Sequence, residues 1–289
     1  MTETIRNPVE WSWDQLRGMG HALGEVGHAL GRSQPARAQP APVVHRIQAR
    51  ELKDVIRKGF ADYGVYRTDV IALCVFYPVV GLLLGRAVYG RDLLPLLFPL
   101  ASGFALIGPF AALGLYEMSR EREHGNKASW ANAFAVLKAP GIGSILILGA
   151  ALVLLFLVWL AVAWLLYALT LGPTPPASVG SFIDALFTTG PGWTLIVVGC
   201  GVGFLFALLA MSISVVSFPL LLDRDVGLGT AVRTSIRAVR MNPGPMAAWG
   251  LVVAGGLVLG SIPLFLGLIV VMPVLGHATW HLYRKLVAG

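Results

Sequence analysis

The chain has 289 residues, of which 56% are hydrophobic and only 13% are charged. Soluble globular domains carry about 25% charged residues, so the composition excludes a soluble domain and predicts an integral membrane protein. The formal net charge of +7 points either to an acidic partner or to a membrane topology with basic loops on one side.

Two segments precede the long apolar runs. Residues 1–43 combine apolar residues at three- and four-residue steps with a Pro/Ala-rich stretch, which predicts an amphipathic appendage followed by an extended linker. Residues 44–68 place basic side chains around helically spaced apolar ones. This pattern predicts a helix that either lies in the lipid headgroup layer or packs on the protein's own cytoplasmic loops, and the sequence leaves both alternatives open.

Residues 69–289 are predicted to form a transmembrane domain. A membrane-spanning helix needs about 20 apolar residues, and by this rule the domain contains six spans. They are Asp69–Tyr89, Leu93–Met118, Gly141–Leu171, Gly192–Leu222, Met246–Ser261 and Ile262–Tyr283.

The basic residues are distributed unequally between the two ends of these spans. Of the 22 Lys and Arg residues, all but Arg86 and Arg91 lie in the N-terminal region, in the loops after the second and fourth spans, or in the C-terminal tail. Positive residues accumulate on the cytoplasmic side of a membrane, so both chain termini are predicted to be cytoplasmic. This asymmetry accounts for the net charge without a nucleic-acid partner.

Two stretches of the chain share a pattern at an offset of 103 positions. Ser129–Gly141 and Val232–Gly244 each contain an Ala-Val pair and end in Pro-Gly. Each stretch belongs to a larger copy, in which a span is followed by a charged turn, a one-sided helix that ends at a proline, and the next span. The predicted fold is therefore an all-α membrane protein with six transmembrane helices and two parallel copies of a span–amphipathic helix–span unit.

The second copy carries two charged groups of interest. Asp223, Arg224 and Asp225 end the fourth span and are predicted to form a structural clamp with charged residues of the first copy. Arg233, Arg237 and Arg240 then follow on one helical face. We interpret this face as a contact for lipid phosphates or an acidic partner, with ordinary positive-inside anchoring as the alternative.

His277 and His281 are the candidates for a metal or haem site. They lie four residues apart, so they share one helical face, and imidazole is a ligand for zinc, copper and haem iron. No carboxylate or cysteine lies near them in the sequence, and histidines are also found in the aromatic belt of a membrane interface. Asp184 is the single charged residue between Pro140 and Leu222. We therefore expect neither an enzyme nor a cofactor.

Three segments carry a resemblance to a known family. They are FPLASGFALIGPFAALGLYEMSREREHG from Phe98, SVVSFPLLLDRDV from Ser214 and VMPVLGHATWHLYRKLV from Val271. Together they resemble a proteobacterial family of uncharacterised six-span inner-membrane proteins, a domain of unknown function sometimes labelled cytochrome c oxidase subunit I-like. The resemblance implies a bacterial inner-membrane location and no established activity. The oxidase label does not carry over, because the predicted spans contain only two histidines.

The leading hypothesis is a non-enzymatic scaffold, assembly or accessory subunit of a larger inner-membrane complex. Such a subunit would contact membrane lipids and either a membrane-protein partner or a second copy of itself. The first alternative is a helical bundle that handles lipids or small solutes. The second alternative is a protein with a metal or haem ligated by His277 and His281.

Overall fold

The computed structural model describes residues 42–74, 94–126, 133, 135–137, 139, 141–174, 176–263 and 265–287. This part of the chain is helical and contains no strand; an isolated bridge pairs Val44 with Val287. The predicted all-α class is therefore confirmed. The helices are η1 (Ala49–Glu51), α2 (Leu52–Cys74), η2 (Leu94–Leu96), α4 (Leu97–Ala111), α5 (Leu113–Glu123), α6 (Ile142–Thr170), α7 (Val179–Thr188), α8 (Gly190–Ser214), α9 (Ser217–Asp223), α10 (Leu228–Met241), α11 (Pro243–Ser261) and α12 (Leu268–Leu286).

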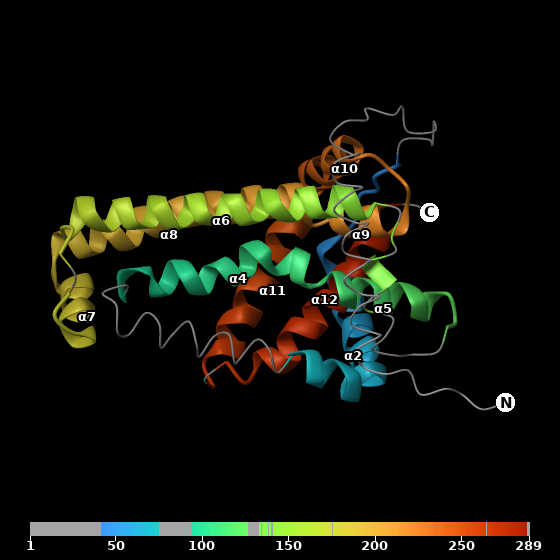
Figure 1. Ribbon diagram of the computed structural model, residues 1–289, viewed down its shortest axis with the longest axis horizontal. Helices are drawn as coiled ribbons and strands as arrows, with labels where there is room; N and C mark the ends of the chain where they lie inside the picture. Colours follow the sequence, from blue (N-terminus) through green and yellow to red (C-terminus); the bar gives the residue numbers. More distant parts are fainter. Residues whose placement is uncertain are drawn as a thin grey trace, which may run out of the picture.

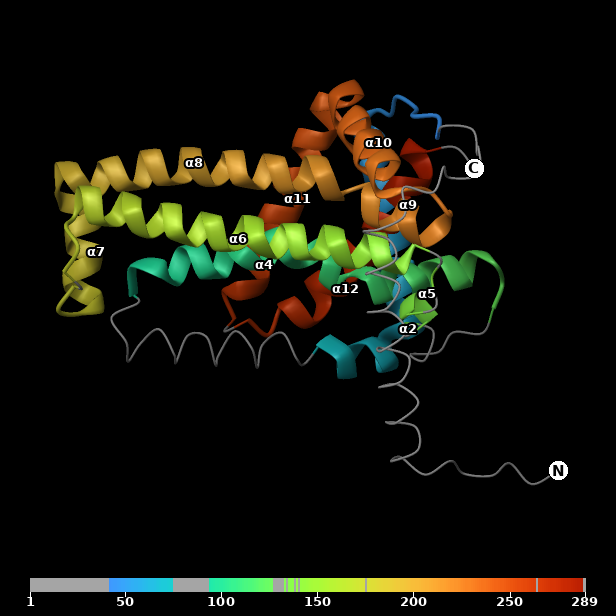
Figure 2. The ribbon, with the colours of Figure 1, turned by 45° about the horizontal axis from the view of Figure 1, so that its top comes forward.

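The helices divide into a packed cluster and two hairpins that project from it (Figure 1). We call the cluster the packed base; it consists of α2, α5, α9, α10, the C-terminal half of α12 and the first turns of α6. Helices α6 and α8 form the longer hairpin, with α4 alongside and α7 at the tip. Helices α11 and α12 form the second hairpin, which crosses the first obliquely in both views (Figure 2).

The hydrophobic core lies in the packed base rather than between the long helices. Large side chains with no exposed surface come from α9 and from the end of α12; they are Phe218, Leu220, Leu221, Trp280, Leu282 and Tyr283. Most charged side chains of the described residues lie in the same base. The end that holds the charges is thus also the end that holds the packed core.

The α6–α8 hairpin changes character where it leaves the base. Up to Leu152, α6 is buried on several sides, whereas the 18 residues from Val153 to Thr170 bury only one stripe, Trp159, Ala163 and Tyr167. In α8 the 20 residues from Gly190 to Leu209 include one buried residue, Gly192. At 1.5 Å per residue these stretches are about 27 and 30 Å long, which matches the ~30 Å hydrocarbon core of a bilayer.

Trp159 holds the neighbouring helices to this hairpin. Its indole N–H donates a hydrogen bond to Ser102 Oγ of α4 over 3.0 Å. Its ring packs against Phe206 of α8, with 5.4 Å between the ring centroids. A buried indole N–H needs such an acceptor, so this one side chain connects three helices within the apolar part of the molecule.

Three stretches of the described residues are long and apolar enough to cross a membrane, namely Ile142–Thr170, Gly190–Asp223 and Pro243–Ser261. They overlap the third, fourth and fifth predicted spans. Most of the first predicted span lies outside the described residues. The second is divided at Ala112 into α4 and α5, and the sixth begins later than predicted, at Leu268. The count of six spans stays a prediction.

A proline lies near each of the two divisions. Pro109 lies near the end of α4, and a proline inside a helix removes one backbone hydrogen bond and bends the helix. Pro219 likewise cannot donate to the carbonyl of Val215, the residue that directly follows α8. Ser235 Oγ of α10 accepts the N–H of Val216 over 3.2 Å. A backbone N–H at the break between α8 and α9 is thus hydrogen-bonded to a side chain of α10.

The amphipathic segment of the predicted repeat is described completely in its second copy only. Residues 232–241 of that copy belong to α10, which is a regular helix. In the first copy the structure describes Ala133, residues 135–137 and Ala139, with a 3-10 conformation at residues 133 and 135–137. Residues 129–132, 134, 138 and 140 of this segment lie outside the described part of the chain. The repeat therefore stays a prediction.

Helix α2 packs along α12. Its buried stripe consists of Leu52, Val55, Gly59, Asp62 and Tyr66. A Cβ added at Gly59 would lie 2.7 Å from Cβ of Ala278, so only glycine allows the two backbones to approach this closely. Residues 44–68 were predicted either to lie in the headgroup layer or to pack on the protein itself. The buried stripe of α2 packs on the protein itself.

Candidate functional site

A buried polar network joins α2, α5 and α12 inside the packed base. Ser119 of α5 donates its hydroxyl proton to Asp62 Oδ2 of α2 over 2.6 Å. His281 Nε2 of α12 lies 2.9 Å from the same carboxylate oxygen, and Arg122 pairs with the other, Oδ1. Asp62 and Ser119 are almost completely buried. We call these residues, together with His277, the Asp62 network.

The order of the side chains in this network differs from that of a catalytic triad. In a triad, histidine lies between the nucleophile and the carboxylate. Here Ser119 lies in the middle, because its oxygen is 2.8 Å from His277 Nδ1 while its proton goes to Asp62. His277 Nδ1 must then be the donor, since the serine proton is already used. This arrangement holds three helices together and does not activate the serine.

Asp62 is ionised at neutral pH. Burial raises the pKa of its carboxyl group, but hydrogen bonds from His281 and Ser119 outweigh burial, so the pKa lies below its ordinary value of 3.8. Hydrogen bonds to an ionised acceptor are roughly twice as strong as neutral ones. The Asp62 network therefore contributes to the stability of the base as a charged cluster.

The two histidines predicted as possible metal or haem ligands belong to this network. His277 Nδ1 is bonded to Ser119, and His281 Nε2 is bonded to Asp62. His281 Nδ1 lies 3.7 Å from Glu123 Oε1. Within the described residues, no group of three or more His, Cys, Asp or Glu side chains could hold a metal ion. One ring nitrogen of each histidine thus has a hydrogen-bond partner within the protein, whereas Nε2 of His277 is buried without one among the described residues.

The acidic and basic residues that end α9 lie at the contact between α9 and α12. Asp223 accepts a hydrogen bond from the Tyr283 hydroxyl over 2.6 Å and lies 3.5 Å from Arg284 Nη1. Arg224 Nε lies 3.6 Å from the Asp223 carboxylate, whereas Asp225 is exposed.

The clamp was expected to bind charged residues of the first copy, which lie on α5. Instead, Asp223 binds α12, and Arg120 of α5 donates to the neighbouring backbone carbonyl of Leu222 over 3.3 Å. Arg120 also pairs with the buried carboxylate of Glu117 over 2.7 Å. The Asp223 contacts connect α9 to α12, and the bond from Arg120 to Leu222 connects α9 to α5.

Asn242 holds the segment before η1 against the junction of α10 and α11. Its side-chain oxygen accepts the N–H of Ile47 over 2.8 Å, and its amide nitrogen donates to the carbonyl of His45 over 3.0 Å. The N–H of His45 in turn donates to the carbonyl of Leu286 over 2.8 Å. These bonds bring residues 42–48, α10 and the end of α12 together.

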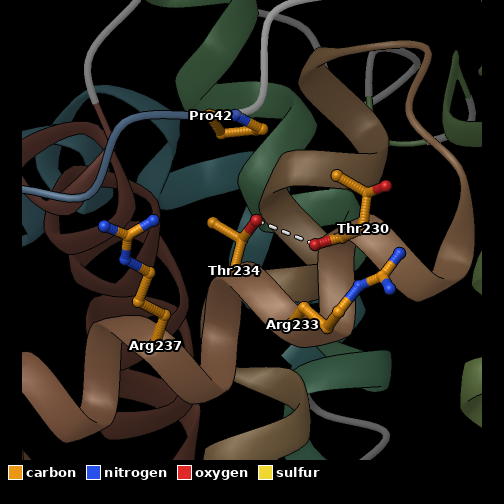
Figure 3. A pocket seen from close by; sticks show the side chains of 5 residues that line it. All are labelled: Pro42, Thr230, Arg233, Thr234 and Arg237. Atoms are coloured by element: carbon orange, nitrogen blue, oxygen red, sulfur yellow. Dashed lines mark hydrogen bonds between the residues drawn. The ribbon is translucent and has the colours of Figure 1, made fainter.

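Arg233, Arg237 and Arg240 lie on the exposed side of α10, as the helical spacing predicts. A shallow pocket of about 250 Å³ lies at the first two of them, lined also by Pro42, Thr230 and Thr234. Figure 3 shows the two guanidinium groups on either side of Thr234. Thr234 donates its hydroxyl to the Thr230 carbonyl over 2.8 Å, and Arg233 Nε donates to the Gly229 carbonyl over 3.0 Å.

Sequence reasoning missed the Asp62 network because its members are far apart in the chain. Asp62 is 57 residues from Ser119 and 219 residues from His281. One signal was present: Asp62 follows Leu52 and Val55 at helical spacing on the face that is buried. A carboxylate on the buried stripe of a helix requires a polar partner, although the sequence does not say which one.

Residues 97–223 match the model of a family described as "Predicted integral membrane protein (DUF2189)". The match extends from α4 to the end of α9, so it includes Ser119, Arg122 and Asp223 but not Asp62, α10 or α12. Over these residues, the match confirms the expected similarity to a family of integral membrane proteins of unknown function; the proteobacterial origin and the oxidase-like label stay predictions. No curated protein and no solved structure matches the chain.

Proposed function

We propose that this integral membrane protein is a non-enzymatic accessory or scaffold subunit of a larger complex in the bacterial inner membrane. In this proposal the packed base lies on the cytoplasmic side and the two hairpins cross the bilayer. The complex supplies a membrane-protein partner that packs against the α6–α8 hairpin.

The observation that carries this proposal is the open surface of α8. Only 6% of its most apolar window is buried within the protein, compared with 28% for α6. Val197, Phe204 and Leu205 expose more than half of their surfaces. Gly201 meets no other helix among the described residues, and small residues on an open helical face allow a second helix to approach closely.

The role of the polar side chains supports a function based on contacts. The carboxylate of Asp62 and the hydroxyl of Ser119 form their hydrogen bonds within the protein, and Asp223 does so as well. These bonds stabilise the base instead of leaving a reactive group exposed. A stable base could hold the α6–α8 hairpin in a fixed position for a partner.

Site-specific photo-crosslinking in native membranes tests this proposal. A photoreactive amino acid at Phe204 in α8 should form an adduct with another membrane protein. The same amino acid at Leu251, which is 74% exposed on α11, serves as the control and should react mainly with lipid. Adducts with lipid alone at Phe204 would contradict the proposal, and so would adducts only with a second copy of this chain.

A further inference from the structure

Among the described residues, the three arginines of α10 lack the carboxylate partners that several other basic residues of the base have. Arg122 pairs with Asp62, Arg284 with Glu123, and Lys285 with Asp54. In contrast, none of the α10 arginines forms a salt bridge within the described part of the chain. The sequence contains no acidic residue after Asp225. Within the described part of the chain, the positive charge of α10 is therefore left for an anion to bind.

Helix α10 has three distinct faces. Ala231, Ser235 and Ala238 are completely buried against the base. Val232, Ile236 and Val239 are half-buried on one flank, and the arginines are exposed on the other. A helix with an apolar flank next to a basic one is typical of the boundary between lipid tails and headgroups.

The position of α10 along the molecule agrees with this boundary. The helix packs against α8 and α9, and Ser235 bonds to Val216 at the junction between them. The stretch of α8 that matches the hydrocarbon core ends at Leu209, and Ala210 is the first residue buried by the base. Headgroup phosphates lie just beyond the hydrocarbon core, so the middle of α10, at Ser235, lies close to their level.

We propose that the pocket formed by Arg233, Arg237, Thr230, Thr234 and Pro42 binds the phosphate group of an anionic phospholipid. Two guanidinium groups on either side of one pocket suit a phosphate, because each can donate two parallel hydrogen bonds to its oxygens. Pro42 belongs to the segment that Asn242 holds in place, so the pocket has a wall from outside α10. The apolar flank of α10 lies where the acyl chains would be.

This inference concerns a lipid and does not depend on the protein partner proposed above. It is tested by native mass spectrometry of the full chain, purified in detergent and titrated with phosphatidylglycerol. The wild type should retain one bound lipid. The R233Q/R237Q variant should bind it more weakly, by about 5-fold for each arginine removed. Because both side chains are exposed, the variant should keep the melting temperature of the wild type.

Two further variants distinguish a site from diffuse charge. R57Q/K58Q removes two exposed charges from α2 and should change the affinity by less than about twofold, because neither residue lines the pocket. R233K/R237K keeps the charge but loses the paired geometry, and should weaken binding by about 3-fold or more. The proposal would be overturned if R233Q/R237Q and R57Q/K58Q lost the same affinity for phosphatidylglycerol, or if R233K/R237K bound the lipid as tightly as the wild type.

A competition experiment separates the source of the phosphate. Millimolar inorganic phosphate should not displace phosphatidylglycerol, because the free ion lacks the acyl chains that would contact the apolar flank. Displacement would instead identify a soluble phosphate compound as the ligand. If R233Q/R237Q binds the lipid normally but loses a protein that co-purifies with the wild type, the face binds an acidic protein and the lipid assignment is wrong.

Discussion

Asp62 is the residue on which the base depends most. Its two carboxylate oxygens bind groups from α5 and α12. The sequence indicates that the helix carrying it is amphipathic, and it indicates that His277 and His281 share a face. The sequence could not show that Asp62 and the two histidines lie side by side, because a single sequence does not reveal which residues more than 50 positions apart are in contact. The histidines were therefore interpreted as possible ligands rather than as partners of a carboxylate.

Replacement of Asp62 by Asn should destabilise the protein. Asn removes the negative charge that His281 and Arg122 contact, and removal of one member of a buried polar cluster leaves the others without a charged partner. We expect a loss of about 2 kcal/mol and a melting temperature about 5 °C lower in detergent. The control is Asp184→Asn, because Asp184 is exposed on α7, far along the hairpin from the base (Figure 1).

The measurement is thermal unfolding of the three proteins followed by tryptophan fluorescence. Equal melting temperatures for wild type and Asp62→Asn would mean that the Asp62 network contributes no net stability. A similar decrease for Asp184→Asn would mean that any lost carboxylate has this effect, and the specific role of Asp62 would then be refuted.

At the scale of the elements, the sequence was informative about helices and less so about their ends. Long apolar runs predicted α6, α8 and α11, and the four- and three-residue steps between the arginines predicted the exposed face of α10. The breaks at Ala112 and Val215 were not predicted, although Pro109 and Pro219 lie within four residues of them. Proline in a membrane span is often tolerated as a kink, so its presence alone does not distinguish a bent helix from two helices.

Asn242 illustrates a contact between elements that no local pattern reveals. Its side chain satisfies two backbone groups about 195 residues away in the chain. Asn242→Ala should leave the N–H of Ile47 without an acceptor and release the segment 42–48 from α10, at a cost of about 1–3 kcal/mol for a buried unsatisfied group. Hydrogen exchange should show faster exchange of the Ile47 amide.

The control for this prediction is Asn126→Ala. Asn126 also bonds through its side chain, to Glu121 over 2.6 Å, but it is exposed and its partner is local. Its replacement should leave exchange at Ile47 unchanged. If Asn242→Ala also leaves that amide protected, the segment is held by other contacts, such as the bridge between Val44 and Val287.

At the scale of the whole molecule, the charges, the hydrophobic core and the polar network are concentrated in one base. From this base extend two hairpins whose exposed surfaces are apolar. The exposed stretches of α6 and α8 have the length of a hydrocarbon core, so lipid or a membrane partner would cover the surfaces that the protein leaves open. The basic face of α10 lies where these stretches begin.

Cysteine labelling from each side of the membrane tests this arrangement most directly. Single cysteines are placed at position 184 in α7, at the native Cys200 in α8, and at position 240 in α10. All other cysteines are replaced by serine. A membrane-impermeant maleimide is then added either to spheroplasts or to inside-out vesicles.

We expect the Asp184→Cys variant to react only in spheroplasts and the Arg240→Cys variant only in inside-out vesicles. Cys200, which is exposed in the protein itself, should react in neither preparation because lipid or a partner covers it. Labelling of Cys200 in either preparation would contradict the account, as would labelling of positions 184 and 240 from the same side.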